Sequence, residues 1–439
     1  MVTQTLSTAE LAGWIDRLAM LDADVDDPER VRQLGLLEAL KGALAAAQAR
    51  VTVDLEASQA AALAASGVPA RRRSEGLAAQ IGLARRVSPV HGARHLGLAR
   101  LLTTALPHTL RALSEGRISE WRATVVARAG VTLDSDGRRE LDERLAGHLD
   151  TMSDRQAEAA ARALAYELDP RAYVDRAAHA ASERRVTMRP APDTMAYLTA
   201  LLPAREAVAV FKALHDAAAS ARAAADERSS DQVKADTLVE RITGQASAAA
   251  VPLEIGLVMT DAAVFGQGDG TPSHDAAYLE GFGPVPASTA RGWLTDPRLR
   301  EAQAWVRRLW SDPITDVVAT VDPKRRRFPA ALRELIVARD QWCRTPWCGA
   351  PIRHTDHASR WAGGGETTPD NAQGLCECCN HAKEAPGWAT AVITDPVGQQ
   401  VVVTRTPTGA VYRSTAPPAL PGWVGRPLAR WDSPEDRAG

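Results

Sequence analysis

Five cysteines, the whole complement of this 439-residue chain, fall in one stretch of the C-terminal part. They form two groups: Cys343 with Cys348, and Cys376 with Cys378 and Cys379. The N-terminus lacks a basic start followed by an apolar run, so no secretory signal is expected. Clustered cysteines in such a chain indicate metal ligands more readily than disulfides. We therefore expect this stretch to fold around a metal ion.

The spacing of the cysteines fits a structural zinc site. Cys343-x4-Cys348 and Cys376-x2-Cys379 can each place two thiolates on one ion from a tight turn. Together the two pairs complete a tetrahedral Cys₄ site, and the residues between them leave room for a β-hairpin. Cys378 is a spare thiol, which could replace Cys379 only by altering the local turn. Reduced, buried thiols are the plain alternative, and five cysteines so close together weigh against it.

Polar residues suited to catalysis lie between the two cysteine groups and just after them. Asp356 and His357 precede a glycine run at 363–365, Asn371 closes the loop, and Asn380 follows the last cysteine. We expect a strand, a wide turn, a second strand and a short helix around one zinc ion. A lone histidine is usually structural, but His357 follows an acid between two ligand pairs, which favours a catalytic role.

The stretch resembles an HNH nuclease of the ββα-metal type, with the pattern DH…GG…N…CxxCN..K. His357 matches the first position and Asn371 the second. The third position falls on Asn380, which gives the HNN variant, and His381 lies one residue late for it. The phrases NAQGLCECCNHAKEAPGW and TPTGAVYRSTAPP are similar to actinobacterial HNH proteins that have a long helical N-terminal region, including the mycobacterial thirteen-E-twelve repeat proteins.

This resemblance implies a role for each polar residue. His357 would be the general base, because a neutral imidazole can take a proton from water near neutral pH. Asp356 and Asn380 would offer oxygen ligands to one Mg²⁺ or Mn²⁺ ion, which would stabilise the departing 3′ oxygen. Asn371 would hold the loop that orients His357. The plain alternatives are a turn-forming role for Asn371 and helix capping by Asn380, and His354 is a weaker alternative ligand.

Basic side chains near this stretch are candidates for phosphate contacts. Those inside it are Arg353, Arg360 and Lys383. Four adjacent cations precede it, and taken alone they fit a solvated linker equally well; they are Lys324, Arg325, Arg326 and Arg327. An upstream triplet, Arg71–Arg73, is weaker evidence for a phosphate contact.

The total charge and the apolar runs of the chain bear on nucleic-acid binding and on membrane insertion. The 52 basic and 54 acidic side chains give a net charge of -2, so the total charge does not indicate a nucleic-acid partner and local charge must carry that case. No apolar run approaches the ~18 residues that a membrane-spanning helix needs. We therefore expect a cytoplasmic protein without a membrane partner.

Residues 1 to about 245 have the pattern of a helical region. Alanine is abundant, Ser7 and Glu10 resemble a helix start, and Val31–Leu63 carries apolar residues at helical spacing. Further helices are expected at Leu77–Leu83, Pro89–Leu102, Pro107–Glu115, Ser119–Ala129, Asp136–Leu149, Ser153–Ala165, Pro170–Glu183, Pro203–Ala225 and Lys234–Thr243. Alternating charges indicate solvated faces of a bundle. Self-association through this region is a further expectation.

Short strands are expected around and after this helical region. Candidate strands are Arg184–Arg189, Val251–Met259, Trp388–Thr394, Gln400–Thr406 and Val411–Ser414. Short strands or loop segments are expected at Ala276–Leu279, Gly292–Leu294 and Val318–Val321. A helix is expected at Pro329–Asp340, directly before the first cysteine. The Pro-rich tail from Ala416 reads as irregular.

The sequence thus predicts an α+β fold of four parts. Residues 1–248 form a mainly α-helical domain, and 249–323 form a mixed α/β connecting region. Residues 324–395 form the zinc-stapled ββα-metal module, and 396–439 form a β-hairpin extension with an irregular tail.

The expected function is that of a metal-dependent HNH endonuclease that hydrolyses DNA phosphodiester bonds. The resemblance implies that it leaves 5′-phosphate and 3′-hydroxyl ends. A non-catalytic, zinc-stapled DNA-binding protein is one alternative. A nuclease derived from a mobile element or phage, acting in recombination or defence, is another. Asp356 together with His357 favours an enzyme over the non-catalytic alternative, whereas the sequence does not separate defence from mobility.

Overall fold

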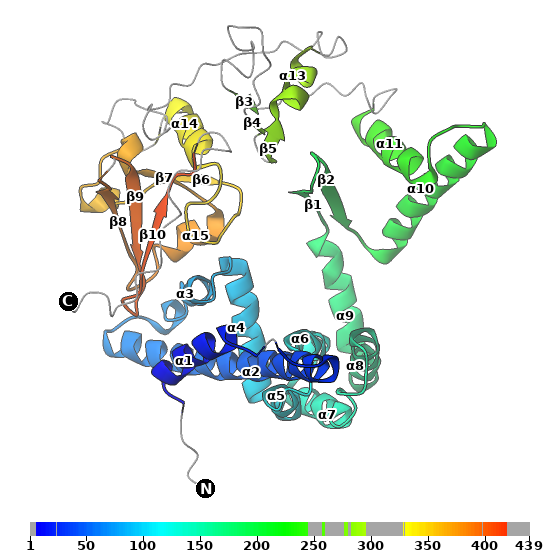
Figure 1. Ribbon diagram of the computed structural model, residues 1–439, viewed down its shortest axis with the longest axis vertical. Coiled ribbons are helices and arrows are strands. Elements are labelled where there is room, and N and C mark those ends of the chain that lie inside the picture. The colour runs from blue at the N-terminus through cyan, green and yellow to red at the C-terminus, as the bar shows by residue number, and fades with distance from the viewer. Residues whose placement is uncertain are drawn as a thin grey trace. The chain divides into compact units, whose positions relative to one another are not determined.

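The computed structural model describes residues 6–22, 24–244, 257–259, 276–279, 282–295, 328, 330–396 and 398–418. These residues are mainly helical, with small antiparallel sheets from residue 185 onward (Figure 1). Contacts divide the chain into two compact units, residues 1–55 with 96–174, and residues 56–95 with 175–439. The second unit therefore combines a piece of the N-terminal helical region with the cysteine stretch, a grouping that the sequence did not predict.

The helices of the first unit follow the apolar periodicity of the sequence. Three of them, α2, α4 and α9, continue into residues of the second unit. The helices are α1 (Thr8–Ala19), α2 (Asp27–Ala65), α4 (Pro89–Thr104), α5 (Pro107–Ser114), α6 (Glu120–Ala129), η2 (Gly130–Thr132), α7 (Ser135–Leu145), α8 (Asp154–Leu168) and α9 (Pro170–Ala180). The predicted cap at Ser7 is present, because its side chain accepts a hydrogen bond from the amide of Glu10.

The core of the first unit is rich in alanine. Ala46 of α2, Ala123 of α6 and Ala157 of α8 are fully buried beside larger side chains such as Leu113 and Leu141. Small residues let helices approach closely, and the leucines fill the remaining space at crystal-like density.

One buried carboxylate stabilises a helix start in this core. Asp142 of α7 accepts hydrogen bonds from the amides of His108 and Thr109, at 2.7 and 2.9 Å, and from the Thr109 hydroxyl. From a neighbouring helix, Asp142 therefore satisfies two amides in the first turn of α5 that have no partner within that helix.

The second unit begins with the end of α2 and continues through η1 (Ala70–Arg72) and α3 (Leu77–Ala84). After α9 and η3 (Ala181–Glu183), β1 (Arg185–Pro190) and β2 (Ala196–Leu201) form an antiparallel hairpin. Two helices that contact each other follow, α10 (Ala204–Ala223) and α11 (Ser230–Thr243). The expected strand at Arg184–Arg189 is thus confirmed.

The small sheet that follows corrects one expectation. It contains β3 (Leu257–Val258), β4 (Ala276–Leu279) and β5 (Gly283–Pro286), and α13 (Ala287–Thr295) follows directly. Gly292–Leu294 therefore lies in a helix, because the segment after Pro286 buries Ala287 and Ala290 on one face at helical spacing. Val318–Val321, residues 251–256 of Val251–Met259 and the tail from residue 419 lie outside the described residues.

The cysteine stretch folds as two strands and a helix. After α14 (Ala330–Asp340), β6 (His354–His357) pairs antiparallel with β7 (Ala372–Leu375), in the register His357 opposite Ala372, and α15 (Glu377–Ala382) follows. Leu332 and Ile336 of α14 pack against Ala372. The expected order of strand, wide turn, strand and short helix is present.

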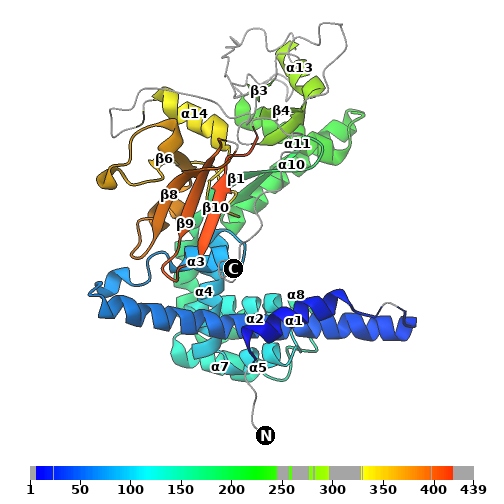
Figure 2. The same cartoon turned by 60° about the vertical axis from the view of Figure 1, so that its left-hand side comes forward.

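A three-stranded antiparallel sheet completes this part of the chain. It has the order β10 (Val411–Thr415), β9 (Gln400–Arg405), β8 (Ala389–Thr394), where a β-hairpin was expected. Figure 2 shows the three strands side by side near β6. The central strand β9 carries the buried residues Val401 and Val402.

A charged network joins α14 to these sheets. The buried carboxylate of Asp340 pairs with Arg339 at 2.7 Å and with Arg344 at 2.9 Å, and it accepts a hydrogen bond from the Gly374 amide at 2.6 Å. Arg344 also donates to the carbonyl of Ser414 in β10. Most polar atoms of the network have partners, although the buried Nε atom of Arg344 has none among the described residues. The network links the helix, the cysteine turn and both sheets.

Helix α3 packs against the same C-terminal part. Ala79 and Leu83 lie in one apolar cluster with Ala385 and Trp388. Gly76, the N-cap of α3, has a φ of 77°, and a Cβ atom there would collide with the indole nitrogen of Trp388. Only glycine combines this backbone conformation with such a close approach.

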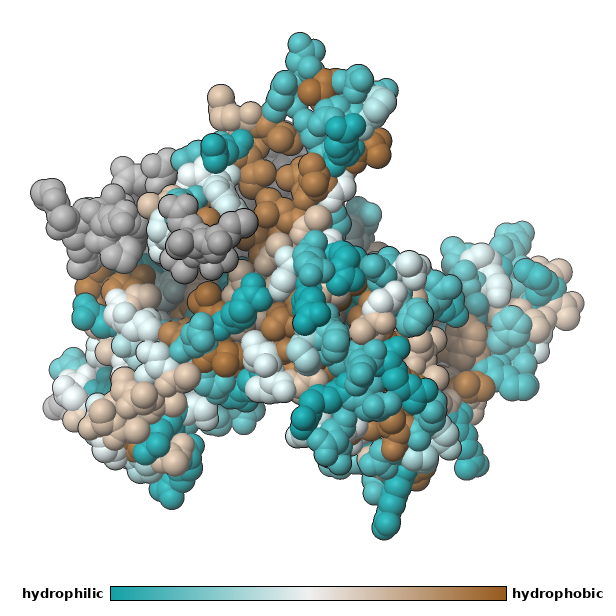
Figure 3. Space-filling view, turned by 90° about the horizontal axis from the view of Figure 1, so that it is seen from below, coloured by the Kyte–Doolittle hydropathy of each residue, from teal (hydrophilic) through white to brown (hydrophobic). Residues whose placement is uncertain are grey.

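Several large apolar side chains remain exposed. Leu11, Ile15 and Leu18 form a stripe at helical spacing on α1, and Val186 and Met188 are exposed on β1. Figure 3 shows apolar patches between hydrophilic residues on one face of the molecule. Among the described residues, no helix is both long and apolar enough to cross a membrane.

Candidate metal centre and active site

Four cysteines form one compact sulfur cluster. The Sγ atoms of Cys343, Cys348, Cys376 and Cys379 all lie within 4.8 Å of one another. Cys348 Sγ lies 3.7 Å from Cys376 Sγ and 3.6 Å from Cys379 Sγ. A disulfide would need about 2.0 Å, whereas zinc–sulfur bonds of about 2.3 Å in a tetrahedron place the sulfurs about 3.8 Å apart. The four thiols are therefore free, and their spacing would allow them to hold one metal ion together.

Two tight turns create this cluster. The amide of Cys343 donates to Ala350 at 2.9 Å and that of Cys348 donates to Thr345 at 3.1 Å, which closes the first turn. Trp347 in this turn has a φ of 58°. Cys376 is the N-cap of α15, and its Sγ accepts a hydrogen bond from the amide of Cys379 at 3.4 Å. The expected spare thiol, Cys378, is exposed and outside the cluster.

Hydrogen bonds among the thiols divide them into two kinds. The pKa of Cys343 is lowered, chiefly by its contact with Cys348, and the pKa of Cys376 is lowered, chiefly by Cys343. Contact with Cys343 is also the main reason why the pKa values of Cys348 and Cys379 are raised. Metal ligation requires thiolates, so binding of a metal ion would displace the protons that the cluster holds.

His357 lies at the end of β6 in a closed environment. It is only 6% exposed, and its Nε2 atom lies 2.9 Å from the hydroxyl of the buried Thr367. The rings of Phe328 and Trp361 lie 4.5 and 5.6 Å from the imidazole, measured between centroids. The imidazole is therefore held in one orientation by packing and by a hydrogen bond at Nε2, and its Nδ1 lies 3.9 Å from Asp356 Oδ1.

Asp356 is bound to a buried lysine. Its Oδ2 atom lies 2.5 Å from the Nζ atom of Lys383, and the same Nζ donates to the carbonyl oxygen of His357 at 2.6 Å. Lys383 is 6% exposed, so its ammonium group does not face solvent. The sequence suggested Lys383 as a phosphate contact. The structure instead gives it an internal position, because the end of α15 packs over β6.

Asn371 closes the loop that follows His357. Its side-chain amide donates to the carbonyls of Ser359 and Glu366, at 3.0 and 2.8 Å, and its Oδ1 atom accepts from the Ser359 amide at 2.8 Å. Gly365 lies so close to Ser359 that a Cβ atom there would collide with its carbonyl oxygen. The loop therefore has a fixed shape, held by one side chain across its neck.

Asn380 and His381 occupy different environments on α15. The Oδ1 atom of Asn380 is buried and has no hydrogen-bond partner among the described residues. A buried acceptor without a partner is costly, so this oxygen is suited to a ligand such as a cation or a water molecule. His381 is exposed on the surface of the helix.

The remaining basic candidates lie at the surface or outside the described part. Arg353 is exposed, and Arg360 donates to the carbonyl of Lys383 at 3.0 Å and pairs with Glu384 at 3.3 Å. The cations Lys324, Arg325, Arg326 and Arg327 lie outside the described residues.

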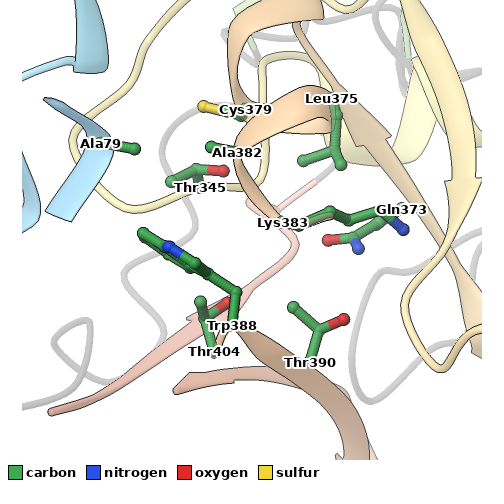
Figure 4. A pocket seen from close by; sticks show the side chains of 10 residues that line it. All are labelled: Ala79, Thr345, Gln373, Leu375, Cys379, Ala382, Lys383, Trp388, Thr390 and Thr404. Atoms are coloured by element: carbon green, nitrogen blue, oxygen red, sulfur yellow. The ribbon is translucent and has the colours of Figure 1, made fainter. Parts of the chain in front are cut away.

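A small cavity of about 20 Å³ lies beside the sulfur cluster, between β7, α15 and the C-terminal sheet (Figure 4). Gln373, Lys383 and Trp388 line it. The side-chain nitrogens Gln373 Nε2 and Trp388 Nε1 are buried, with no hydrogen-bond partner among the described residues. A cavity of this size accommodates about one water molecule, which would satisfy a buried donor.

Sequence reasoning did not identify Thr367, the Asp340 network or Gln373. The Asp340 network could have been found from three charged residues near the first cysteine, Arg339, Asp340 and Arg344. Two of them stand at the end of a helix that buries apolar side chains. No local pattern marks Thr367 or Gln373, which acquire their roles only when β7 and the loop meet β6.

The family described as "Domain of unknown function (DUF222)" matches residues 10–340. No curated protein and no solved structure matches the chain. The match includes α3, which packs against Ala385 and Trp388, and α14, which ends at Asp340. It ends just before Cys343. Because the match covers well over half of the sequence, the chain belongs to the DUF222 family.

Proposed function

We propose that the chain is a metal-dependent HNH endonuclease that hydrolyses DNA phosphodiester bonds. The observation that carries the proposal is the position of Asp356 and His357 at the end of β6, paired with β7 and followed by α15. Asn371 and Asn380 stand on the loop and the helix of the same unit, next to four cysteines that could hold a zinc ion. This is the order of elements expected of a ββα-metal nuclease.

Zinc would have a structural role here. Its four candidate ligands come from the turn before β6 and from the start of α15, so one ion would tie together both ends of the hairpin. Four thiolates leave no open coordination position for a substrate, which separates this site from a catalytic one.

His357 is suited to act as the general base. The contact of Nε2 with Thr367 fixes the orientation of the ring. Nδ1 lies on the side of Asp356, whose side chain is 30% exposed. A proton taken from water by the imidazole would leave a hydroxide close to the acidic residue.

Asp356 and Asn380 would hold the divalent ion. The carboxylate and the unpartnered Oδ1 atom of Asn380 are hard oxygen ligands of the kind that Mg²⁺ and Mn²⁺ prefer. When bound, the ion would supply positive charge to the scissile phosphate and to the leaving oxygen. Lys383 provides the positive charge beside Asp356 in this structure, so an incoming ion would share the carboxylate with an ammonium group.

A non-catalytic DNA-binding protein is the second candidate, and two observations favour it. The imidazole of His357 is buried, and the carboxylate of Asp356 is paired with Lys383. Both features would also suit a purely structural hairpin. The two candidates differ in one property, which is hydrolysis.

Plasmid nicking with added Mg²⁺ or Mn²⁺ separates the two candidates. We expect the wild type to relax supercoiled DNA and His357→Ala to lose this activity. His381→Ala is the matched control, because His381 is an exposed histidine of the adjoining helix, and we expect it to keep the activity. Equal nicking by the wild type and His357→Ala would contradict the proposal, as would no nicking by either. Loss of activity in His381→Ala alone would move the third catalytic position to His381.

Three further proposals concern the surroundings of the enzyme. DNA is the proposed partner, and reduced thiols at the metal site suit the cytoplasm. We also propose self-association through the helical region, supported by the exposed stripe of Leu11, Ile15 and Leu18 on α1. Sedimentation of the full chain, compared with Ile15→Lys, tests this directly, and a monomeric wild type would refute it.

A further inference from the structure

One segment of the family domain reaches the proposed active site. Helix α3 packs Ala79 and Leu83 against Ala385 and Trp388, and Gln80 donates to the Thr408 hydroxyl at 2.6 Å. Burial of these apolar groups and the close approach of Gly76 fix the start of the helix on the C-terminal part. The short helix η1, which precedes α3, is therefore fixed there as well.

This docking brings arginines from two distant segments to the end of α15. Arg72 of η1 lies with its Nη2 atom 3.5 Å from the carbonyl of Glu384, and Arg360 donates to the carbonyl of Lys383 at 3.0 Å. Helix C-terminal carbonyls carry partial negative charge, so both guanidinium groups are favoured there. Residue 384 is directly next to Lys383, which binds Asp356.

We propose that Arg71 and Arg72 of η1 form a second phosphate-binding element, which extends the DNA surface of the proposed nuclease. The inference rests on the proposed function in that it names the partner as DNA. It goes further by giving the family domain a direct role in holding the substrate backbone, beside Arg360 of the nuclease part.

The surroundings of the arginines at 71–73 support this assignment. Arg73 is half-buried and donates to the Val68 carbonyl at 2.9 Å, so it stabilises the turn. Arg71 is exposed, and the described residues give it no ion pair. Among the residues that the structure describes, Arg72 pairs with the exposed Glu75, at 2.9 Å, and contacts Glu384. Exposed pairs of this kind are weak, so a phosphate group can compete for the guanidinium.

The salt dependence of DNA binding tests the proposal. Full-length protein carrying His357→Ala, without added Mg²⁺, is titrated with a duplex of mixed sequence at several salt concentrations. Each phosphate contact contributes about 0.9 to the slope of log K against log salt concentration. We expect Arg71→Ala to reduce the slope by about 0.9 and the double variant Arg71→Ala/Arg72→Ala to reduce it by about 1.8.

Two arginines serve as matched controls. Arg94 is exposed on α4, as Arg71 is on η1. Arg139 pairs with Asp136 at 2.8 Å across three residues, as Arg72 pairs with Glu75. We expect Arg94→Ala and Arg139→Ala to leave the slope unchanged. Limited proteolysis of each variant shows whether α3 stays docked, and Arg71→Ala, which removes no described contact with the C-terminal part, isolates the effect on binding.

The outcomes separate this inference from the proposed function. Wild-type slopes in Arg71→Ala and in the double variant overturn the inference, even when the wild type nicks plasmid. Equal losses in the controls overturn it too, because the effect is then one of total charge. Absence of any duplex binding also overturns it. A reduced slope together with absent nicking supports the inference for the DNA-binding candidate and rejects the nuclease.

Discussion

The ammonium group of Lys383 lies 2.5 Å from Oδ2 of Asp356 and also donates to the carbonyl of His357 at 2.6 Å. One buried side chain thus ties the end of α15 to the last two residues of β6. Lys383→Met removes both bonds and leaves a partly buried carboxylate without its cation. We expect the free energy of unfolding to fall by about 1–3 kcal/mol, measured by urea denaturation.

An exposed pair provides the control for Lys383. Lys212 and Asp216 lie 2.7 Å apart, with side chains 72% and 61% exposed. Lys212→Met should change stability by less than about 0.5 kcal/mol, since solvent screens such a pair. Equal effects of the two substitutions would show that Lys383 is not held internally.

Cysteine substitutions test the metal centre, with an internal comparison at adjacent residues. Cys379→Ser removes one of four clustered thiols, whereas Cys378→Ser removes an exposed thiol outside the cluster. We expect one zinc ion per chain in the wild type and in Cys378→Ser after dialysis against a weak chelator, and loss of zinc in Cys379→Ser. Elemental analysis gives the metal content, and retention of zinc by Cys379→Ser would contradict the four-cysteine site.

Substitutions at Gly76 and at Gly67 together test the docking of α3, with Gly67 as the control position. Their φ angles are 77° and 76°, but only Gly76 faces a neighbour, the indole of Trp388. Gly67→Ala should lower the free energy of unfolding by about 1–2 kcal/mol, because a residue with a Cβ atom is strained in the left-handed backbone region. Gly76→Ala carries the same backbone cost and adds a collision, so it should also release α3. Increased proteolysis between α2 and α4 in Gly76→Ala, but not in Gly67→Ala, is the expected result.

The stability of the protein in acid should depend on the buried carboxylate of Asp340. Burial raises the pKa of this carboxyl, but Arg344 and Arg339 outweigh burial and hold its pKa below the ordinary value. A group whose pKa is depressed on folding stabilises the protein fully above its unfolded pKa, about 4, and loses this contribution as pH falls through its lower folded pKa. Stability should therefore fall in acid below about pH 4 in the wild type.

Asp340→Asn isolates this effect. The variant should be less stable at pH 7 by about 3–5 kcal/mol, since it leaves two buried arginines without their counter-ion. Its unfolding free energy should also change less than that of the wild type between pH 5 and pH 2. The other titratable groups are the same in both proteins, so the difference between the two curves belongs to the substitution at Asp340. If the unfolding free energies of the two proteins changed in parallel with pH, the Asp340 carboxylate would make no pH-dependent contribution to stability.

The parts of the site that sequence predicted are those set by local geometry. Ligands with four or fewer residues between them in a turn have nearly fixed positions, so Cys343-x4-Cys348 and Cys376-x2-Cys379 were sufficient to predict the cluster and to leave Cys378 as the spare thiol. The loop closed by Asn371 follows from its glycines and is similarly local.

Contacts between distant segments could not be predicted in this way. The position of Lys383 depends on how α15 packs over β6, and a charged residue at a helix end is usually exposed. The segment Gly292–Leu294 is too short for its period to be recognised, and its helix becomes evident only from the buried alanines that precede it. The docking of α3 on Trp388 joins residues more than 300 positions apart, and no single-sequence pattern reports such a pairing.

The packing of α3 against Trp388 has a consequence for biosynthesis. The apolar face formed by Ala79 and Leu83 leaves the ribosome early, but its partners are among the last described residues to be made. At roughly 5–20 residues per second, this face waits tens of seconds for Trp388. The nascent chain therefore leaves this apolar face of α3 without these partners during most of its synthesis. A chain that stops before the cysteine stretch never covers it, which marks truncated products for chaperones and proteases.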